Sequence, residues 1–193
     1  MKIVCVTGMR GCGKSVLGEA AKMRGMPVFE MRDIVAEMMA AENIIMSNRN
    51  MREFAKGIRE VYGKDIVARK MAERIRAAGI RRGVVLVIGV RGMYEVRAFR
   101  EAFGEQNVVL LAIHSPPKMR FQRVMSRTGK IDDPKSYDEF LWSDEMELGY
   151  GVSKAISLAD LMIVNDGTLE EYINKCKEIL ALVERNGAEA AAV

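Results

Sequence analysis

The sequence contains few cysteines and a single histidine. The three cysteines, Cys5, Cys12 and Cys176, are odd in number and widely separated, so they form neither a disulfide framework nor a metal-binding spacing. This cysteine usage favours a reducing cytosol, and we expect a cytoplasmic protein. The one histidine, His114, ends an apolar run, where a packed or hydrogen-bonded role is more common than a catalytic one.

Long apolar runs are also missing. No segment approaches the roughly 20 apolar residues that a membrane helix needs, and the apolar stretch at residues 3–6 is too short for the core of a signal peptide. The 30 Lys and Arg exceed the 26 Asp and Glu by a net charge of only +4, without a dense basic block. The sequence therefore argues against membrane and nucleic-acid partners, and it leaves open a small anionic ligand or a mixed, solvated surface.

What is present is the pattern of an α/β domain. Hydrophobic residues make up 49% of the 193 residues, enough for the core of one domain of ordinary size. Short β-type runs alternate with helical patterns, which is typical of a parallel sheet flanked by helices. The runs predict strands at Lys2–Thr7, 27–30, 83–88, Val108–His114 and 161–165. They predict helices at 15–24, 33–42, 52–57, 64–78, 94–103 and 117–127, and a last helix that Thr168 and Glu171 begin with a capping box.

A phosphate-loop motif follows the first strand. Residues 8–15, GMRGCGKS, fit the pattern G-x-x-x-x-G-K-[ST], in which glycines let successive backbone N–H groups converge on phosphate oxygens. Lys14 would reach the β- and γ-phosphates of ATP, and Ser15 would offer its hydroxyl to Mg²⁺. A glycine-rich turn without a ligand does not explain why Lys and Ser follow the last glycine. The motif predicts ATP-binding residues Gly8, Met9, Arg10, Gly11, Cys12, Gly13, Lys14 and Ser15.

Seven segments together resemble one known family. They read VCVTGMRGCGKS, MPVFEMRDIV, VLVIGVRGMYEVRAF, AIHSPPKMRFQRVMSR, DDPKSYDEF, SDEMELGYG and ISLADLMIVNDGTLEE. Up to about Leu182, the chain looks like the archaeal P-loop family related to dephospho-coenzyme A kinase and, more distantly, to adenylate and cytidylate kinases. The resemblance implies a three-layer α/β P-loop NTPase fold, with a five-stranded parallel sheet in the order 2-3-1-4-5. It also implies one domain at 1–185, with an acceptor-binding insert at 43–79 and a lid at 127–152, followed by a frayed tail at 186–193.

The resemblance further implies catalytic and substrate-binding residues on the acceptor side. Asp33 matches a carboxylate that faces the acceptor, although it is also a good N-cap for the following helix, and the two roles can coexist. Arg91, just after the third strand, would contact the acceptor at the carboxyl end of the sheet, where a solvated arginine is the alternative. Within the insert we select Arg59 as a substrate-binding residue over Arg49 and Arg52.

Other residues are assigned by the resemblance to the donor side and the lid. Arg120 and Arg127 would be catalytic, because lid arginines neutralise the charge of the transferring phosphoryl group; Arg123 shares their helix face and is the weakest of the three candidates. Asn165 and Gly167 end the last strand, where related kinases pass the adenine ring. Four acidic residues of the lid are candidates to pair with these arginines: Asp132, Asp133, Asp144 and Glu145.

The chain departs from the family pattern at three positions near the expected site. The family's D-G-x-R reads I-G-V-R at residues 88–91, so Ile88 replaces a carboxylate that normally supports Mg²⁺. Arg32 replaces a glycine, and Ser143 replaces an arginine of the lid. The leading hypothesis is an ATP-dependent phosphotransferase for a nucleotide or another small phosphorylated acceptor. A nucleotide-binding sensor or partner protein with little turnover is the alternative, and Ile88 favours it. The sequence leaves the oligomeric state open.

Overall fold

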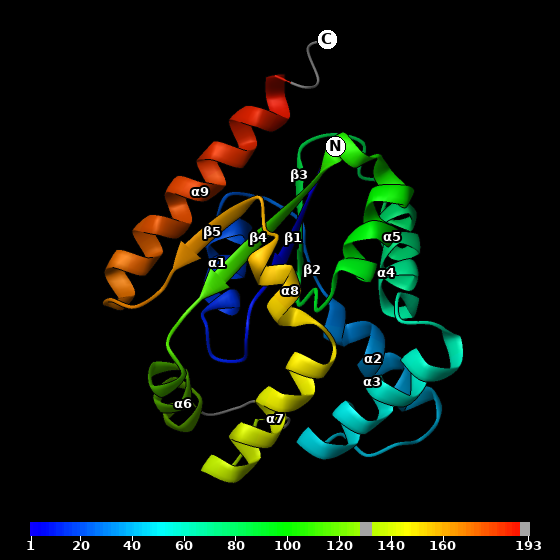
Figure 1. The fold of residues 1–193 in the computed structure, drawn as a ribbon. Coiled ribbons are helices and arrows are strands. Elements are labelled where there is room, and N and C mark those ends of the chain that lie inside the picture. Colours follow the sequence, from blue (N-terminus) through cyan, green and yellow to red (C-terminus); the bar gives the residue numbers. More distant parts are fainter. Residues whose placement is uncertain (128–132, 190–193) are drawn as a thin grey trace.

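The computed structural model describes residues 1–127 and 133–189 (Figure 1). Its centre is one parallel sheet of five strands, in the order β2-β3-β1-β4-β5. The strands are β1 (Lys2–Thr7), β2 (Val28–Glu30), β3 (Val84–Ile88), β4 (Val108–His114) and β5 (Leu161–Val164). The predicted α/β class and the predicted strand order are both confirmed.

Helices connect and cover the strands. In the described ranges they are α1 (Lys14–Met23), α2 (Met31–Ala41), α3 (Asn48–Tyr62), α4 (Ile66–Ala77), α5 (Met93–Phe103), η1 (Glu105–Asn107), α6 (Pro117–Ser126), α7 (Tyr137–Gly149), α8 (Val152–Ser157) and α9 (Leu169–Glu189). None of the helices in these ranges combines the length and the apolar character needed to span a bilayer. Of the predicted tail, residues 186–189 belong to α9, and residues 190–193 lie outside the described part of the chain.

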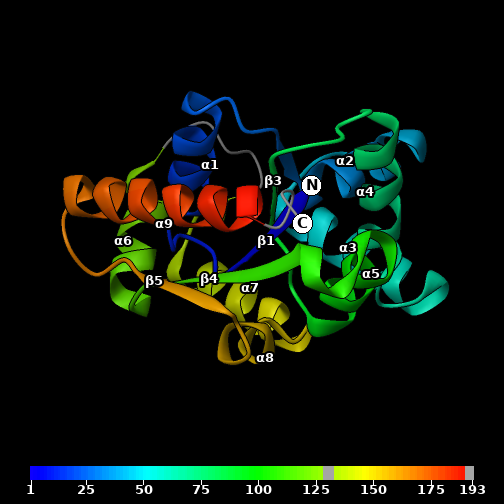
Figure 2. The ribbon, with the colours of Figure 1, turned by 90° about the horizontal axis from the view of Figure 1, so that it is seen from above.

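The central strand shows why three layers form. In β1, Ile3 and Cys5 belong to a core that includes residues of α2, α4 and α5, whereas Val4 and Val6 belong to a core that includes residues of α1 and α9. Successive side chains of a strand point to opposite faces, so a strand covered on both faces must be apolar at every position. Figure 2 shows α1 and α9 on one side of the sheet and α4 and α5 on the other.

Helix boundaries differ from the predicted ones where tertiary contacts decide them. Helix α2 begins directly after β2 with Glu30 as its N-cap, so the prediction that Asp33 caps this helix is wrong. The fully buried Met31 anchors the first turn in the core, and Asp33 lies within that turn. Helix α3 is longer than the predicted 52–57, because the side chain of Ser47 caps it by accepting a hydrogen bond from Asn50 N–H at 3.1 Å.

The carboxyl-terminal helix begins as predicted. Thr168 Oγ1 accepts a hydrogen bond from Glu171 N–H at 3.2 Å, and the Glu171 carboxylate accepts one from Thr168 N–H at 2.7 Å. These reciprocal bonds satisfy two N–H groups that have no partner within the helix. The predicted capping box is therefore confirmed.

Candidate functional site

The loop between β1 and α1 has the geometry that its glycines permit. Gly8, Gly11 and Gly13 have φ angles of 143°, 78° and 114°, a region that L-residues with side chains rarely adopt. A Cβ atom on Gly11 would lie 2.7 Å from the carbonyl oxygen of Arg120. Gly13 precedes the first residue of α1, so the positive end of the helix dipole faces the loop. The loop is therefore shaped to bind an anion with its backbone.

Side chains from the last strand and last helix hold this loop from outside. Asn165 Nδ2 donates to the carbonyl of Cys12 at 2.8 Å, and the hydroxyl of Tyr172 donates to the carbonyl of Gly13 at 3.0 Å. Both Cys12 and Asn165 are buried. The structure thus gives Asn165 a role in fixing the loop, and it does not bring Asn165 or Gly167 into the pocket lining.

Lys14 lies folded over the loop. Its Nζ donates to the carbonyl oxygens of Gly8 at 2.5 Å and Met9 at 3.0 Å. The ammonium group is therefore held next to the converging backbone amides, where it adds a point charge to the anion site.

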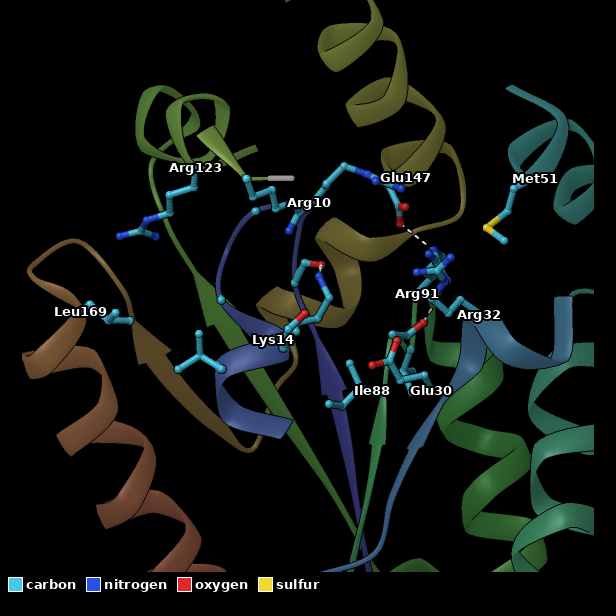
Figure 3. A pocket seen from close by; sticks show the side chains of 18 residues that line it. Arg10, Lys14, Glu30, Arg32, Met51, Ile88, Arg91, Arg123, Glu147 and Leu169 are labelled. Carbon is cyan, nitrogen blue, oxygen red and sulfur yellow. Dashed lines mark hydrogen bonds and ion pairs between the residues drawn. The ribbon is translucent and has the colours of Figure 1, made fainter. Parts of the chain in front are cut away.

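A cavity of about 410 Å³ opens above the loop (Figure 3). This volume is in the usual range for small-molecule sites. Figure 3 shows Arg123 and Leu169 on one side of Lys14, and Glu30, Arg91 and Glu147 on the other. The described residues that line it include two carboxylates, Glu30 and Glu147, and six cationic side chains, Arg10, Lys14, Arg32, Arg91, Arg123 and Arg127. The excess of cations makes the cavity suitable for a ligand with several negative charges.

The side of the cavity lined by Arg91 and Glu147 contains a buried ion-pair network. Arg91 Nε donates to Glu147 Oε2 at 2.7 Å, and Arg52 Nη1 donates to Glu147 Oε1 at 3.0 Å. Burial alone would raise the pKa of Glu147, but the guanidinium groups of Arg91 and Arg52 outweigh it and hold that pKa well below the ordinary value. Glu147 is therefore ionised in the folded protein at neutral pH.

Two predicted acceptor residues lie outside the cavity lining. Asp33 is exposed on the first turn of α2, and the carboxylate that faces the cavity from this region is Glu30, the last residue of β2. Arg59 is buried, donates to Glu95 at 2.8 Å and lies over the ring of Tyr150 at 4.8 Å. This pair joins α3 to α5, and Arg59 does not line the cavity.

The three arginines predicted to act from the lid do not all line the cavity. Arg120 is buried in a bidentate pair with Asp144, at 2.9 and 2.6 Å, and it is not part of the cavity lining. Arg123, the weakest of the three candidates, lines the cavity and donates to Ser115 Oγ at 2.9 Å. Arg127 lines it as well and pairs with Asp133 at 2.5 Å.

The four acidic residues predicted in the lid differ in whether they pair with an arginine. Asp133 accepts hydrogen bonds from both Arg127 and Arg10, the latter at 2.6 Å, and Asp144 pairs with Arg120. Glu145 is exposed, and Asp132 lies outside the described residues. Pairing between lid acids and arginines is therefore present for Asp133 and Asp144.

Sequence reasoning missed Glu30 and Glu147 as site residues. The parallel register pairs Glu30 with Ile88, so the end of β2 places a carboxylate beside Ile88 at the carboxyl edge of the sheet. The signal for Glu30 was its position as the last residue of the second strand. No comparable signal marked Glu147, because its position depends on how α7 packs against α3.

Comparisons with known proteins agree with this fold. A family model described as an AAA domain matches residues 7–140. The UPF0200 protein of Pyrococcus horikoshii is 37% identical over 184 residues, which cover 95% of this chain and 98% of that protein. Dephospho-CoA kinase from Campylobacter jejuni is similar in structure, with a TM-score of 0.58 and 15% identity over 96% of this chain and 98% of that one. Shikimate kinase from Acinetobacter baumannii in complex with shikimate has a TM-score of 0.57 and 16% identity, over 96% and 94% of the two chains. The expected resemblance to P-loop kinases is confirmed, and at these identities the two structures show the fold alone.

Proposed function

The chain belongs to the UPF0200 family, and on that premise we propose that it is an ATP-dependent phosphotransferase for a nucleotide or another small phosphorylated acceptor. The observation that carries the proposal is the cationic lining of the cavity above the phosphate loop. Phosphoryl transfer needs positioning and charge neutralisation more than covalent chemistry, and this lining supplies both.

On the donor side, the loop amides and the start of α1 would hold the phosphates of ATP, with Lys14 on the β- and γ-phosphates. Arg123 and Arg127 would neutralise the charge that develops on the transferring group. The hydroxyl of the acceptor would attack the γ-phosphorus and release its proton to solvent, and the bond between this phosphorus and the β–γ bridging oxygen would break, so that ADP leaves. Leu169, the first residue of α9, offers an apolar contact on this side of the cavity.

The donor set fits Mg²⁺ bound together with ATP. Magnesium prefers oxygen ligands and is usually held by one or two protein groups plus phosphate oxygens and water. The Ser15 hydroxyl and the Glu30 carboxylate both line the cavity and would serve as these groups. When bound, the metal would supply positive charge that neutralises part of the phosphate charge. In the described ranges, no group of three or more His, Cys, Asp or Glu is arranged to hold a metal by itself.

A second candidate function is nucleotide binding with little turnover, as in a sensor or partner protein. Ile88 favours it, because an apolar side chain lines the cavity where the related kinases carry a metal-supporting carboxylate. A Cβ atom on Gly18 would lie 2.7 Å from Ile88 Cδ1, so this side chain is directed at α1.

Phosphate transfer separates the two functions. The protein is incubated with labelled MgATP and a panel of nucleotides, dephospho-coenzyme A and other phosphorylated metabolites. A kinase transfers label to one acceptor, and Lys14→Ala abolishes the transfer. Tight nucleotide binding with only trace release of free phosphate would support the sensor function instead. A failure of the folded protein to bind any adenine or guanine nucleotide would refute both.

A further inference from the structure

The acceptor-side arginines are already occupied by a carboxylate of the protein. Glu147 is 4% exposed, and its two oxygens bind Arg91 from the end of β3 and Arg52 from α3. Because Glu147 itself belongs to α7, three elements that are far apart in the sequence meet at one carboxylate. Figure 3 shows this carboxylate directed at Arg91 inside the cavity.

The hydrogen bonding of Arg52 is incomplete in this arrangement. Its Nε donates to Asn48 Oδ1 at 2.9 Å and its Nη1 to Glu147, but the buried Nη2 has no partner within the described ranges. Arg52 is 4% exposed, so water does not readily satisfy this donor. Both oxygens of Glu147 already bind a guanidinium group, and a larger anion with three oxygens would supply the missing acceptor.

The space beside these residues is too small for a phosphate in this arrangement. A side cavity of about 20 Å³ is lined by the polar residues Arg10, Arg32, Asn48, Arg52, Arg91 and Tyr150 and by the apolar residues Val35, Met51 and Ala55. One water needs at least about 10–15 Å³. The side cavity therefore has room for about one water, and an anion as large as phosphate reaches Arg52 only after the surrounding side chains rearrange.

We propose that Glu147 occupies the binding site of the acceptor's anionic group, and that a phosphate monoester on the acceptor displaces it from Arg52 and Arg91. This inference rests on the proposed function, because it specifies the acceptor of the same site. A phosphate monoester carries about −1.5 to −2 charges at pH 7, compared with −1 for a carboxylate. It therefore competes for paired guanidinium groups better than Glu147 or a monocarboxylate ligand does.

Polar contacts join α7 and the residue that follows it to α3. Asn48 Nδ2 donates to Ser143 Oγ at 3.2 Å, and the Tyr150 hydroxyl donates to the carbonyl of Arg52 at 2.8 Å. Trp142, the single tryptophan of the chain, lies on α7 with the guanidinium of Arg49 from α3 over its ring at 5.5 Å. Displacement of Glu147 loosens this contact, so the fluorescence of Trp142 reports it.

The test measures ribose 5-phosphate binding to the full chain by calorimetry, with Mg²⁺ and a non-hydrolysable ATP analogue saturating the phosphate loop. Glu147→Gln keeps the shape of the side chain and removes its charge, and we expect it to bind ribose 5-phosphate about tenfold more tightly than wild type. Glu145→Gln removes an exposed charge from the same helix and should match wild type. Arg52→Met should weaken binding at least tenfold, whereas Lys56→Met, an exposed change on α3, should not.

Trp142 emission gives a readout that does not depend on any variant folding. In the wild-type protein, ribose 5-phosphate should change the emission over the same concentration range as the calorimetric isotherm, and ribose and acetate should not. Glu147→Asp, which keeps the charge on a shorter side chain, should bind with an affinity between those of wild type and Glu147→Gln.

Three results would overturn the inference. The first is that Glu147→Gln binds ribose 5-phosphate no more tightly than Glu145→Gln does. The second is that Glu147→Gln increases the affinity for acetate as much as the affinity for ribose 5-phosphate, and the third is that no folded variant binds ribose 5-phosphate. Binding of the ATP analogue is recorded first in every variant. If the analogue binds and Glu147→Gln shows no gain, the inference alone fails. If the folded wild-type protein does not bind the analogue, the proposed function fails.

Discussion

At the scale of one residue, a substitution of Glu30 tests whether its carboxylate takes the role that the apolar Ile88 cannot fill. Glu30 ends β2 in register with Ile88 and lines the cavity, whereas Asp33 is exposed and outside the lining. We expect Glu30→Gln to weaken the Mg²⁺-dependent part of ATP binding by at least about tenfold, since even groups that act on a metal only through its ligands contribute about 10–100-fold. Binding of ATP without Mg²⁺ should change little. Titration calorimetry with and without Mg²⁺ measures the difference.

Asp33→Asn is the matched control, because it removes a carboxylate three residues away on the same segment. It should leave the Mg²⁺ dependence close to that of wild type. The reverse pattern, with a large effect of Asp33→Asn and none of Glu30→Gln, would restore the sequence-based assignment of Asp33.

A substitution of Arg59 gives a second prediction at this scale: the stability of the protein should change, whereas its affinity for ATP should not. Its pair with Glu95 is buried, and Glu95 is fully buried. Arg59→Met leaves that carboxylate without its main counter-ion, and removing one partner of a buried pair costs about 3–5 kcal/mol. Urea unfolding should show a loss of this size, with ATP affinity unchanged. Lys56→Met on the exposed face of α3 should cost little. A normal stability with impaired acceptor binding would instead support Arg59 as a substrate residue.

At the scale of elements, the sequence predicted whatever depended on local patterns. The strands of the sheet, the phosphate loop and the Thr168 capping box follow from periodicity and from residue types at fixed spacing. The start of α2 was missed because Met31 is drawn into the core, which local propensity does not reveal. The insert helix α3 was predicted too short, because Gly57 and the charged face of the helix hid its continuity.

The N-cap of α3 gives an element-scale prediction. Ser47 accepts a hydrogen bond from Asn50 N–H, and Arg52, which pairs with Glu147, lies in this helix. Ser47→Ala should destabilise the protein by about 1 kcal/mol, since the first turn loses its side-chain acceptor. Ser47→Asp keeps an acceptor and should stay close to wild type. Chemical unfolding of the three proteins compares these values, and an equal loss for both variants would contradict the capping role.

At the scale of the whole molecule, the site is assembled by ion pairs between distant segments. Arg91 follows β3, Arg52 lies in α3 and Glu147 lies in α7. Asp133 joins Arg127 to Arg10 of the phosphate loop. A sequence pattern shows that such residues are present, but it cannot rank them, because the ranking depends on which helices meet. This is why the sequence did not single out Arg123 and Glu147 as residues of the cavity lining, whereas the phosphate-loop motif is recognisable from residue spacing alone.

The same assembly makes folding stability depend on pH in a predictable direction. The pKa of Glu147 is depressed in the folded protein by Arg91 and Arg52, against the effect of burial, so the unfolded chain binds the proton more readily. The stabilisation from Glu147 is therefore fully present above the ordinary glutamate pKa, near 4.5, and is lost progressively as the pH falls below it towards the folded value.

Glu147→Gln does not titrate, so its free energy of unfolding should fall less than that of wild type between pH 7 and pH 4. Urea unfolding at both pH values, with Glu145→Gln as the control for an exposed carboxylate, measures the difference. Parallel pH profiles for wild type and Glu147→Gln would show that the carboxylate is not held by these two arginines in solution.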